Sequence, residues 1–217
     1  MDQRKFDDAR SRNISGHEMD CAAVAEEIIA LKNNDLVLRA KLVRQGELHG
    51  HYHEQMRAMH DRNADRLNEL VDRIGYPTID LVGKEAADAA WLIIQHAIGK
   101  PAFMKKCVKL LESAVNEQRA DPHSLAYLSD RINVFEDRPQ YYGTQFDWDE
   151  QGELSPNIYD DLAAVNKRRI AIGLNTLEEQ TDVIRRRARE EKQLPPADFY
   201  DWKRQFNAWR RALGWIK

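Results

Sequence analysis

Residues 84–98 are the stretch that most constrains the fold. Apolar residues occupy most positions from Ala86 to Ile98, so a helix built from them is apolar around nearly its whole circumference. Such a helix needs neighbours on all sides, and we expect it to be the central helix of a bundle. Gln95 and His96 interrupt the apolar surface, and buried polar side chains need hydrogen-bond partners. The sequence therefore predicts a polar site inside a helical core.

The composition favours helices and gives no sign of a nucleic-acid or membrane partner. The 217 residues include 32% charged residues but only 10 Gly and 7 Pro, which is typical of helices with solvated faces. The formal net charge of −3 creates no overall attraction to nucleic acid or anionic lipid, and no run of 18 apolar residues occurs. The N-terminus resembles no signal peptide, and Cys21 and Cys107 have no metal or disulfide spacing. We therefore expect a protein of the reducing cytoplasm, with no nucleic-acid or membrane partner.

Helix signals in the first third of the chain leave one alternative open. A capping box at residues 15–18 predicts a first helix that ends just before Asp35, which would cap the next element. That element runs to Ile74 as one bent helix or as two helices, because Gly46 and Gly50 weaken its middle.

The rest of the chain predicts a mainly α fold, a helical bundle with one small β-hairpin near residues 140–158. After an extended piece at 78–83, the expected helices are 84–98, 101–115, 122–135, 160–172, 176–192 and 199–213. The predicted organisation is an N-terminal helical extension (1–59), a core domain with the hairpin (60–178) and a C-terminal helical tail (179–217). The aromatic residues of the tail follow one helical face, which favours docking on a core over a dimer contact or nucleic-acid binding.

A histidine stripe lies on the helical face that otherwise carries apolar residues. His49 and His53 are one turn apart and could chelate a metal ion, but His60 is about 10 Å further along the axis, so the three cannot share one ion. The stripe fits a polar layer in a helix–helix or dimer seam, with the imidazoles bonded to the facing helix. A pocket lined by one or two of these histidines, or a metal site at His49 and His53, are the alternatives.

The sequence contains no GxSxG, Walker A, GxGxxG or HExxH motif, so the candidate site is a set of polar residues between positions 91 and 145. His96 is the candidate acid or base, and Asp130 and Tyr142 complete the candidate catalytic residues. The candidate substrate-binding residues are Trp91, Gln95, Arg131, Gln140, Thr144 and Gln145, with Arg131 as an anion clamp. The alternative is a satisfied structural network that joins two helices to the hairpin.

Linked motifs make residues 60–178 similar to a known bacterial family. The motifs that carry the resemblance are Gln95-His96-Ala97, Tyr127-Leu128 with Asp130-Arg131, and Pro139-Gln140 with Tyr142-Gly143-Thr144-Gln145. This pattern resembles an uncharacterised family, a domain of unknown function without an established activity. The resemblance implies a pocket at the matching positions and adds Arg169 to the candidate substrate-binding residues.

We therefore expect a small cytoplasmic enzyme of hydrolase or lyase type that does acid–base chemistry on a polar small molecule or a modified peptide. No cofactor is predicted, and a homo-oligomer is expected. One alternative is a helical interaction or regulatory module whose polar network is structural. Another is a metal-dependent enzyme that uses His49 and His53.

Overall fold

The computed structural model describes residues 15–47 and 52–217, with side chains from residue 21 onward. Within these residues the chain forms eight helices and one two-stranded antiparallel hairpin, so the predicted mainly α fold is confirmed. None of the described helices is long and apolar enough to cross a membrane. The chain divides into two compact units, up to Ala120 and from Asp121 onward. The sequence did not predict this boundary.

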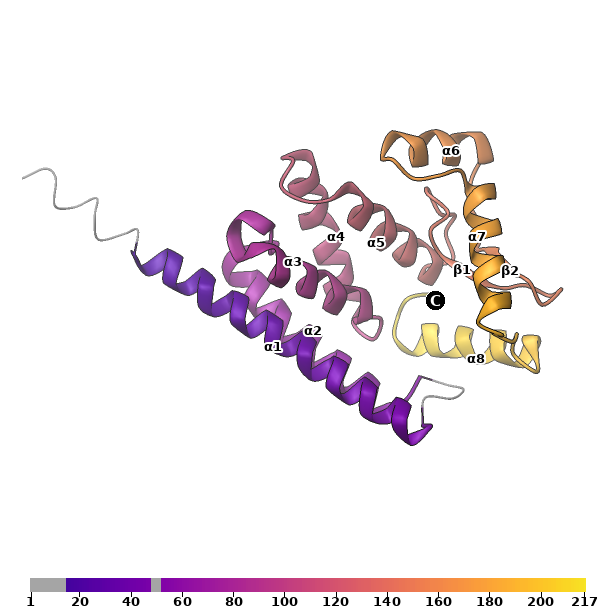
Figure 1. The fold of residues 1–217 in the computed structure, drawn as a ribbon, viewed down its shortest axis with the longest axis horizontal. Coiled ribbons are helices and arrows are strands. Elements are labelled where there is room, and N and C mark those ends of the chain that lie inside the picture. The colour runs from indigo at the N-terminus through magenta and orange to yellow at the C-terminus, as the bar shows by residue number, and fades with distance from the viewer. Residues whose placement is uncertain (1–14, 48–51) are drawn as a thin grey trace, which may run out of the picture. The chain divides into compact units, whose positions relative to one another are not determined.

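The first unit consists of four helices, α1 (Ser15–Gln45), α2 (Glu54–Ile74), α3 (Ile79–His96) and α4 (Pro101–Asn116). The long helix α1 packs against both α2 and α3, and α3 also packs against α4 (Figure 1). As expected from its composition, α3 contributes many fully buried side chains. These are Val82, Ala86, Ala89, Ala90, Ile93, Ile94 and Gln95.

The predicted end of the first helix is wrong, because α1 continues past Asn33 and Asn34 to Gln45. Ile28, Asp35 and Leu42 are seven residues apart, so they lie on one face of the helix, and all three are buried. Packing of this face against α2 and α3 outweighs the weak helix propensity of the two asparagines. Asp35 is therefore an interior residue of α1 and not a cap. The predicted capping box at residues 15–18 lies outside the described side chains.

The next predicted segment forms two separate helices rather than one bent helix. Helix α1 ends at Gln45, and Gly46 follows with a φ of 67°, in the left-handed region that favours glycine. Helix α2 begins at Glu54 after the N-cap His53 and ends before Gly75.

The start of α3 also differs from the prediction of an extended piece at residues 78–83. The carbonyl of Thr78 accepts hydrogen bonds from the amides of Leu81 and Val82, which makes a helical turn before Gly83. Gly83 then interrupts the helix with a φ of 77° and a ψ of 163°. The apolar stretch that follows is helical, as predicted.

The second unit consists of α5 (Pro122–Phe135), the strands β1 (Phe146–Trp148) and β2 (Leu154–Pro156), and the helices α6 (Leu162–Ala171), α7 (Leu177–Glu190) and α8 (Phe199–Ala212). The hairpin is present but short. Residues 141–145 were expected to belong to its first strand, and this expectation is wrong, because they lie outside both strands. The physical reason is that backbone amides in this segment bond to a side chain, Asp130, and not to a neighbouring strand. We call residues 140–145 the central loop.

The C-terminal helix α8 packs on the end of α5. The ring of Phe135 lies 6.1 Å from that of Phe206 and 5.8 Å from that of Trp209, measured between centroids. The buried Arg210 donates hydrogen bonds to the carbonyls of Val134 (2.9 Å) and Phe135 (3.2 Å), which are acceptors that the end of α5 leaves open. The aromatic face of the tail therefore docks within its own unit.

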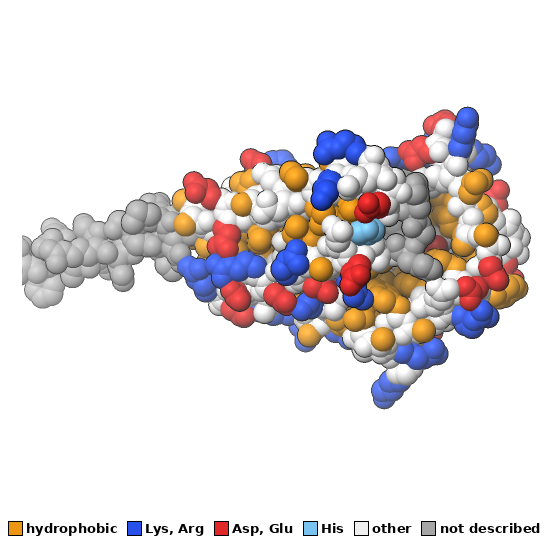
Figure 2. Space-filling model, turned by 90° about the horizontal axis from the view of Figure 1, so that it is seen from below, with side chains coloured by type: hydrophobic (Ala, Val, Ile, Leu, Met, Phe, Trp, Pro, Cys, Tyr) orange, Lys and Arg blue, Asp and Glu red, His pale blue; other side chains and the backbone are white. Residues whose placement is uncertain are grey.

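The surface carries charges of both signs. On the face shown in Figure 2, Lys and Arg side chains are interspersed with Asp and Glu side chains. This distribution agrees with a formal net charge of only −3.

Candidate functional site

A buried carboxylate in the first unit lies between two histidines from two other helices. Asp35, in the middle of α1, is 1% exposed. The Oδ2 atom of Asp35 lies 3.2 Å from Nε2 of His60 on α2 and 3.0 Å from Nδ1 of His96 on α3. The two imidazole rings are neighbours, with centroids 4.5 Å apart. We call these three residues the Asp35 cluster.

His60 is held at both ring nitrogens. Its Nε2 atom faces Asp35, and its Nδ1 atom pairs with the hydroxyl of Tyr52, which lies just before α2. One turn further along α2, the amide of Asn63 donates to the carbonyl of Leu31 on α1 at 3.1 Å. His60 therefore lies in a polar layer between two helices, as the helix–helix seam interpretation of the histidine stripe predicts.

His96 differs from His60 because only one of its ring nitrogens has a partner among the described residues. Its Nδ1 atom faces Asp35, whereas Nε2 makes no hydrogen bond to any residue that the structure describes. The side chain of His96 is 31% exposed, against 10% for His60. The His96 side chain is thus partly exposed, and its Nε2 atom has no described partner.

The charges of the cluster favour an ionised Asp35. Burial raises the pKa of the Asp35 carboxyl, but the hydrogen bonds from His60 and His96 outweigh burial and hold this pKa well below its usual range. A carboxylate can only accept hydrogen bonds, so without a metal ion the two facing nitrogens carry the protons. In the neutral form of the ring this places the lone pair on Nε2 of His96, the nitrogen that a general base would use.

The Asp35 cluster also has the ligand set of a metal site. One ligand atom from each of Asp35, His60 and His96 can be chosen so that all lie within 4.8 Å of one another. The predicted metal candidates are other residues: His49 lies outside the described residues, and His53 is the N-cap of α2. The Nδ1 atom of His53 accepts from the amide of Gln55 at 3.2 Å.

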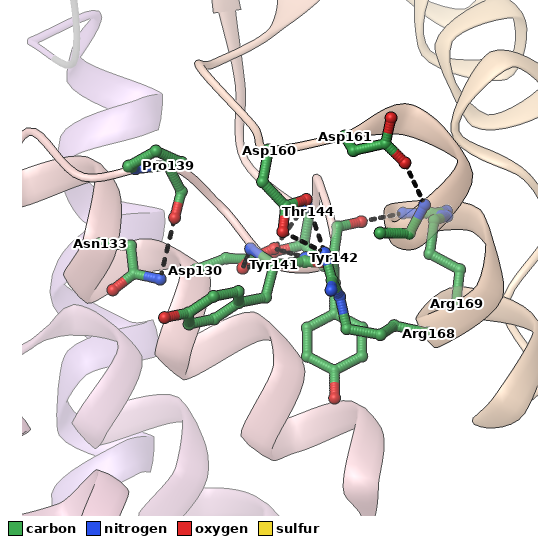
Figure 3. Close-up of polar contacts among 11 residues, drawn as sticks. Asp130, Asn133, Pro139, Tyr141, Tyr142, Thr144, Asp160, Asp161, Arg168 and Arg169 are labelled. Atoms are coloured by element: carbon green, nitrogen blue, oxygen red, sulfur yellow. Dashed lines mark hydrogen bonds and ion pairs between the residues drawn. The ribbon is translucent and has the colours of Figure 1, made fainter.

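A second buried carboxylate, Asp130 on α5, organises the central loop of the second unit (Figure 3). It is 0% exposed and accepts hydrogen bonds from the backbone amides of Tyr141 (2.8 Å), Tyr142 (3.2 Å) and Thr144 (2.9 Å). The hydroxyl of Thr144 also donates to Asp130 at 3.0 Å. Burial raises the pKa of this carboxyl, while its donors act in the opposite direction. These contacts are those of a group that holds a loop in place.

Two glutamines close the central loop from inside. The buried Gln140 side chain accepts from the amide of Gln145 at 2.7 Å and donates to the carbonyls of Gln145 and Asn157. The side chain of Gln145 accepts from Nε of Arg131 at 3.1 Å and donates to the hydroxyl of Thr144. Burial lowers the pKa of Arg131. The hydrogen bonds of these two glutamines therefore hold the loop together and join it to Arg131 and Asn157.

Two arginines of α6 hold the carbonyl groups of the same loop. Arg168 donates to the carbonyl of Tyr141 at 2.7 Å, and the buried Arg169 donates to the carbonyl of Tyr142 at 2.7 Å. Arg169 also bonds to the backbone and side chain of Asn175. Burial lowers the pKa of Arg169, and nearby acidic groups counteract this. The loop is thus fixed by a carboxylate on its amides and by guanidinium groups on its carbonyls.

The sequence comparisons place these features in a family. Residues 22–189 match the model of DUF6624, a family of unknown function. The chain belongs to this family. The matched region extends further towards the N-terminus than the predicted residues 60–178, and it includes Asp35 as well as Asp130. No curated protein and no solved structure matches the chain.

The predicted site residues fall into two groups within this family member. Trp91, Gln95 and His96 lie on α3 of the first unit. The second unit holds Asp130, Arg131, Gln140, Tyr142, Thr144, Gln145 and Arg169. A single pocket formed by both groups stays a prediction, as do the catalytic roles of Asp130 and Tyr142.

The sequence interpretation missed Asp35 as the partner of both His60 and His96, and it missed Tyr52 as the partner of His60. Asp35 was assigned to a cap, although it stands seven residues from both Ile28 and Leu42. A polar residue at the core position of an apolar stripe is the signal that could have identified it. Tyr52 has no comparable periodic signal, because it lies outside the helices.

Proposed function

We propose that the protein is an enzyme of hydrolase or lyase type that moves a proton through His96, with Asp35 as the positioning residue. The substrate is a polar small molecule or a modified peptide. The observation that carries the proposal is the arrangement of His96. Its Nδ1 atom lies 3.0 Å from a fully buried carboxylate, while its other nitrogen has no described partner and the side chain is 31% exposed.

The roles of the residues follow from this arrangement. The Asp35 carboxylate fixes the tautomer and the orientation of the His96 ring, so Nε2 is available to accept a proton from substrate or water and to return it. His60 contacts the same carboxylate beside His96 and is itself held by Tyr52, which keeps the carboxylate in one orientation. The proposal depends on the first unit alone.

The test is a screen of the purified full-length chain with p-nitrophenyl acetate, p-nitrophenyl phosphate and bis(p-nitrophenyl) phosphate. A positioned general acid or base contributes about 10²–10⁴-fold to a rate, so His96→Ala is expected to lose turnover by that factor. Asp35→Asn is expected to lose most of the same factor, because the ring is no longer oriented. The matched control is His123→Ala, which removes an exposed histidine that also contacts an aspartate, Asp121, at 2.8 Å.

Chemical modification examines the same nitrogen independently of the substrate. Diethyl pyrocarbonate reacts with accessible, unprotonated imidazole nitrogens, and peptide mass spectrometry locates the product. In the chain freed of metal ions with EDTA, we expect His96 to react and His60, whose two ring nitrogens are both engaged, to be protected. Full turnover by His96→Ala, or an unreactive His96, would contradict the proposal.

A second candidate function is a helical interaction module, and the outer face of α1 favours it. Leu36, Ala40 and Val43 follow each other at positions i, i+4 and i+7 and are all exposed, with Leu36 at 46% and Val43 at 52%. A second copy of the chain is the simplest partner for this stripe, in agreement with the predicted homo-oligomer. Light scattering after size-exclusion chromatography would then show a dimer that Val43→Glu dissociates, whereas a monomeric wild-type protein would contradict this candidate.

A further inference from the structure

We infer that Asp35, His60 and His96 bind one divalent transition-metal ion of the zinc class. This inference goes beyond the proposed function, since it concerns the same cluster but does not depend on turnover. The ligands would be a carboxylate oxygen of Asp35, Nε2 of His60 and Nδ1 of His96. The remaining coordination position would hold water or a substrate oxygen.

The distances within the cluster agree with coordination. Zinc–nitrogen and zinc–oxygen bonds are close to 2.0–2.2 Å, so neighbouring ligand atoms of a tetrahedral site lie roughly 3.3–3.5 Å apart. Asp35 Oδ2 lies 3.2 Å from Nε2 of His60 and 3.0 Å from Nδ1 of His96. Because all three ligand atoms are already within 4.8 Å of one another, small side-chain rotations are enough to admit the ion.

The residue types select the kind of ion. Two imidazoles and one carboxylate suit zinc and neighbouring transition metals, whereas Mg²⁺ and Ca²⁺ prefer sets made only of oxygen. Three protein ligands with an open position are typical of a catalytic zinc site and not of a structural one. His96 is partly exposed, so the cluster has one edge at the protein surface.

Two further observations support a cation at this position. The Nδ1 atom of His60, on the side away from Asp35, pairs with the hydroxyl of Tyr52, and a hydrogen bond of this kind commonly orients a metal-bound histidine. Asp35 is buried, and among the described residues it contacts no Lys or Arg side chain. A divalent ion would compensate its charge more fully than hydrogen bonds from two imidazoles do.

Metal binding would also change the role of His96 in the proposed reaction. With Nδ1 on the metal, His96 would be a ligand and no longer the base, and the ion would supply a bound water of lowered pKa for the proton transfer. Nε2 of His96 would then carry a proton and could donate a hydrogen bond to the substrate. The proposed reaction class would stay the same, and the same residues would be needed.

The test measures zinc binding to the full-length chain after its metal has been removed with EDTA. Competition with a chromophoric chelator should give one high-affinity Zn²⁺ per chain and no competition by Mg²⁺. His60→Gln and His96→Gln should each lower the affinity by more than about 100-fold, and Tyr52→Phe by roughly 10–100-fold through loss of the orienting hydrogen bond. His123→Gln and His53→Gln, which alter histidines outside the cluster, should leave the affinity unchanged.

The folding of each variant is monitored by circular dichroism and by thermal unfolding with and without Zn²⁺. An ion that binds the native state raises its melting temperature, so the wild-type protein should gain stability from Zn²⁺ and His96→Gln should not. Since His96 is partly exposed, this variant is expected to fold even where His60→Gln does not. Absence of tight Zn²⁺ binding by the wild type, or affinity unchanged in His96→Gln, overturns the inference.

The outcomes separate this inference from the proposed function. Tight Zn²⁺ binding that requires His96, in a chain whose turnover does not need His96, would establish the site and refute the enzyme proposal. Turnover that requires His96 without any tight Zn²⁺ binding would support the enzyme proposal and refute the zinc site.

Discussion

Among the described residues, two aspartates are almost completely buried, yet the groups that contact them differ in their chemistry. Asp35 is 1% exposed and Asp130 is 0% exposed. Asp35 contacts two imidazoles, which can exchange protons and bind metal ions. Asp130 contacts three backbone amides and one hydroxyl, none of which titrates near neutral pH. Burial alone therefore says little about function, and the chemical type of the partners decides it.

The two sites also differ in how completely their polar atoms are used. Around Asp130, the side chains of Gln140 and Arg169 use their hydrogen bonds on the central loop and on Asn157 and Asn175 beyond it. Around Asp35, one imidazole nitrogen of His96 has no described partner. A fully bonded network stabilises a structure, whereas a site that acts on another molecule must keep at least one group available.

The largest expected effect is that of Asp130→Asn on stability. The amide group offers one acceptor where the carboxylate has two, and its NH₂ group faces backbone N–H donors, so buried amides of the loop lose their partners. We expect a loss of about 3–4 kcal/mol in the free energy of unfolding, measured with urea. Faster hydrogen exchange at the amides of Tyr141, Tyr142 and Thr144 should accompany it.

The control for this change is Asp121→Asn, at the exposed N-cap of α5, where asparagine caps as well as aspartate. It should change the stability by less than about 0.5 kcal/mol. Equal effects of the two substitutions would mean that Asp130 does not organise the loop.

Gly143→Ala should cause the next largest loss, about 2–3 kcal/mol in urea unfolding. Gly143 has a φ of 62°, and an added Cβ would lie 2.7 Å from Cδ1 of Leu177. Gly152→Ala is the matched control, because its φ of 74° imposes the same strain while its Cβ would meet Pro195 at an ordinary 3.5 Å. The control should lose only about 1 kcal/mol. Similar losses would show that α7 does not pack closely on the loop.

Asp35→Asn should cost less than Asp130→Asn, about 1–2 kcal/mol, because its partners are side chains that can reorient. Asp65→Asn is the control in the same unit. Asp65 is an exposed partner of Lys100, and surface pairs of this kind contribute little. If Asp35→Asn were as costly as Asp130→Asn, the Asp35 cluster would be primarily structural.

The sequence predicted the element types well where hydrophobic spacing is regular. The apolar stretch after Gly83, the helices α4 to α7 and the small hairpin follow from periodicity and capping residues. The helix predicted over 176–192 begins with a capping box at Thr176, which has both of its hydrogen bonds. These features are local, so their causes lie within a few residues of each other.

The errors occurred where distant residues decide the local structure. Asn33 and Asn34 are weak helix formers, but α1 passes through them because Ile28, Asp35 and Leu42 pack on other helices. The segment from Tyr141 to Gln145 has residues typical of a strand, but its backbone amides donate hydrogen bonds to the side chain of Asp130. The partnership of Asp35 with His96 spans 61 residues, and no local pattern encodes it.

The smallest effect on stability is expected for His96→Gln, and it tests the comparison most directly. His96 is partly exposed, and a glutamine can still donate an N–H to Asp35, so the loss should stay below about 1 kcal/mol. The same substitution should remove Zn²⁺ binding and turnover. Such a separation, with stability retained and function lost, is typical of a group that acts on another molecule. If His96→Gln instead destabilised the chain as much as Asp35→Asn, His96 would be a structural partner like those of Asp130, and the interaction module would become the better proposal.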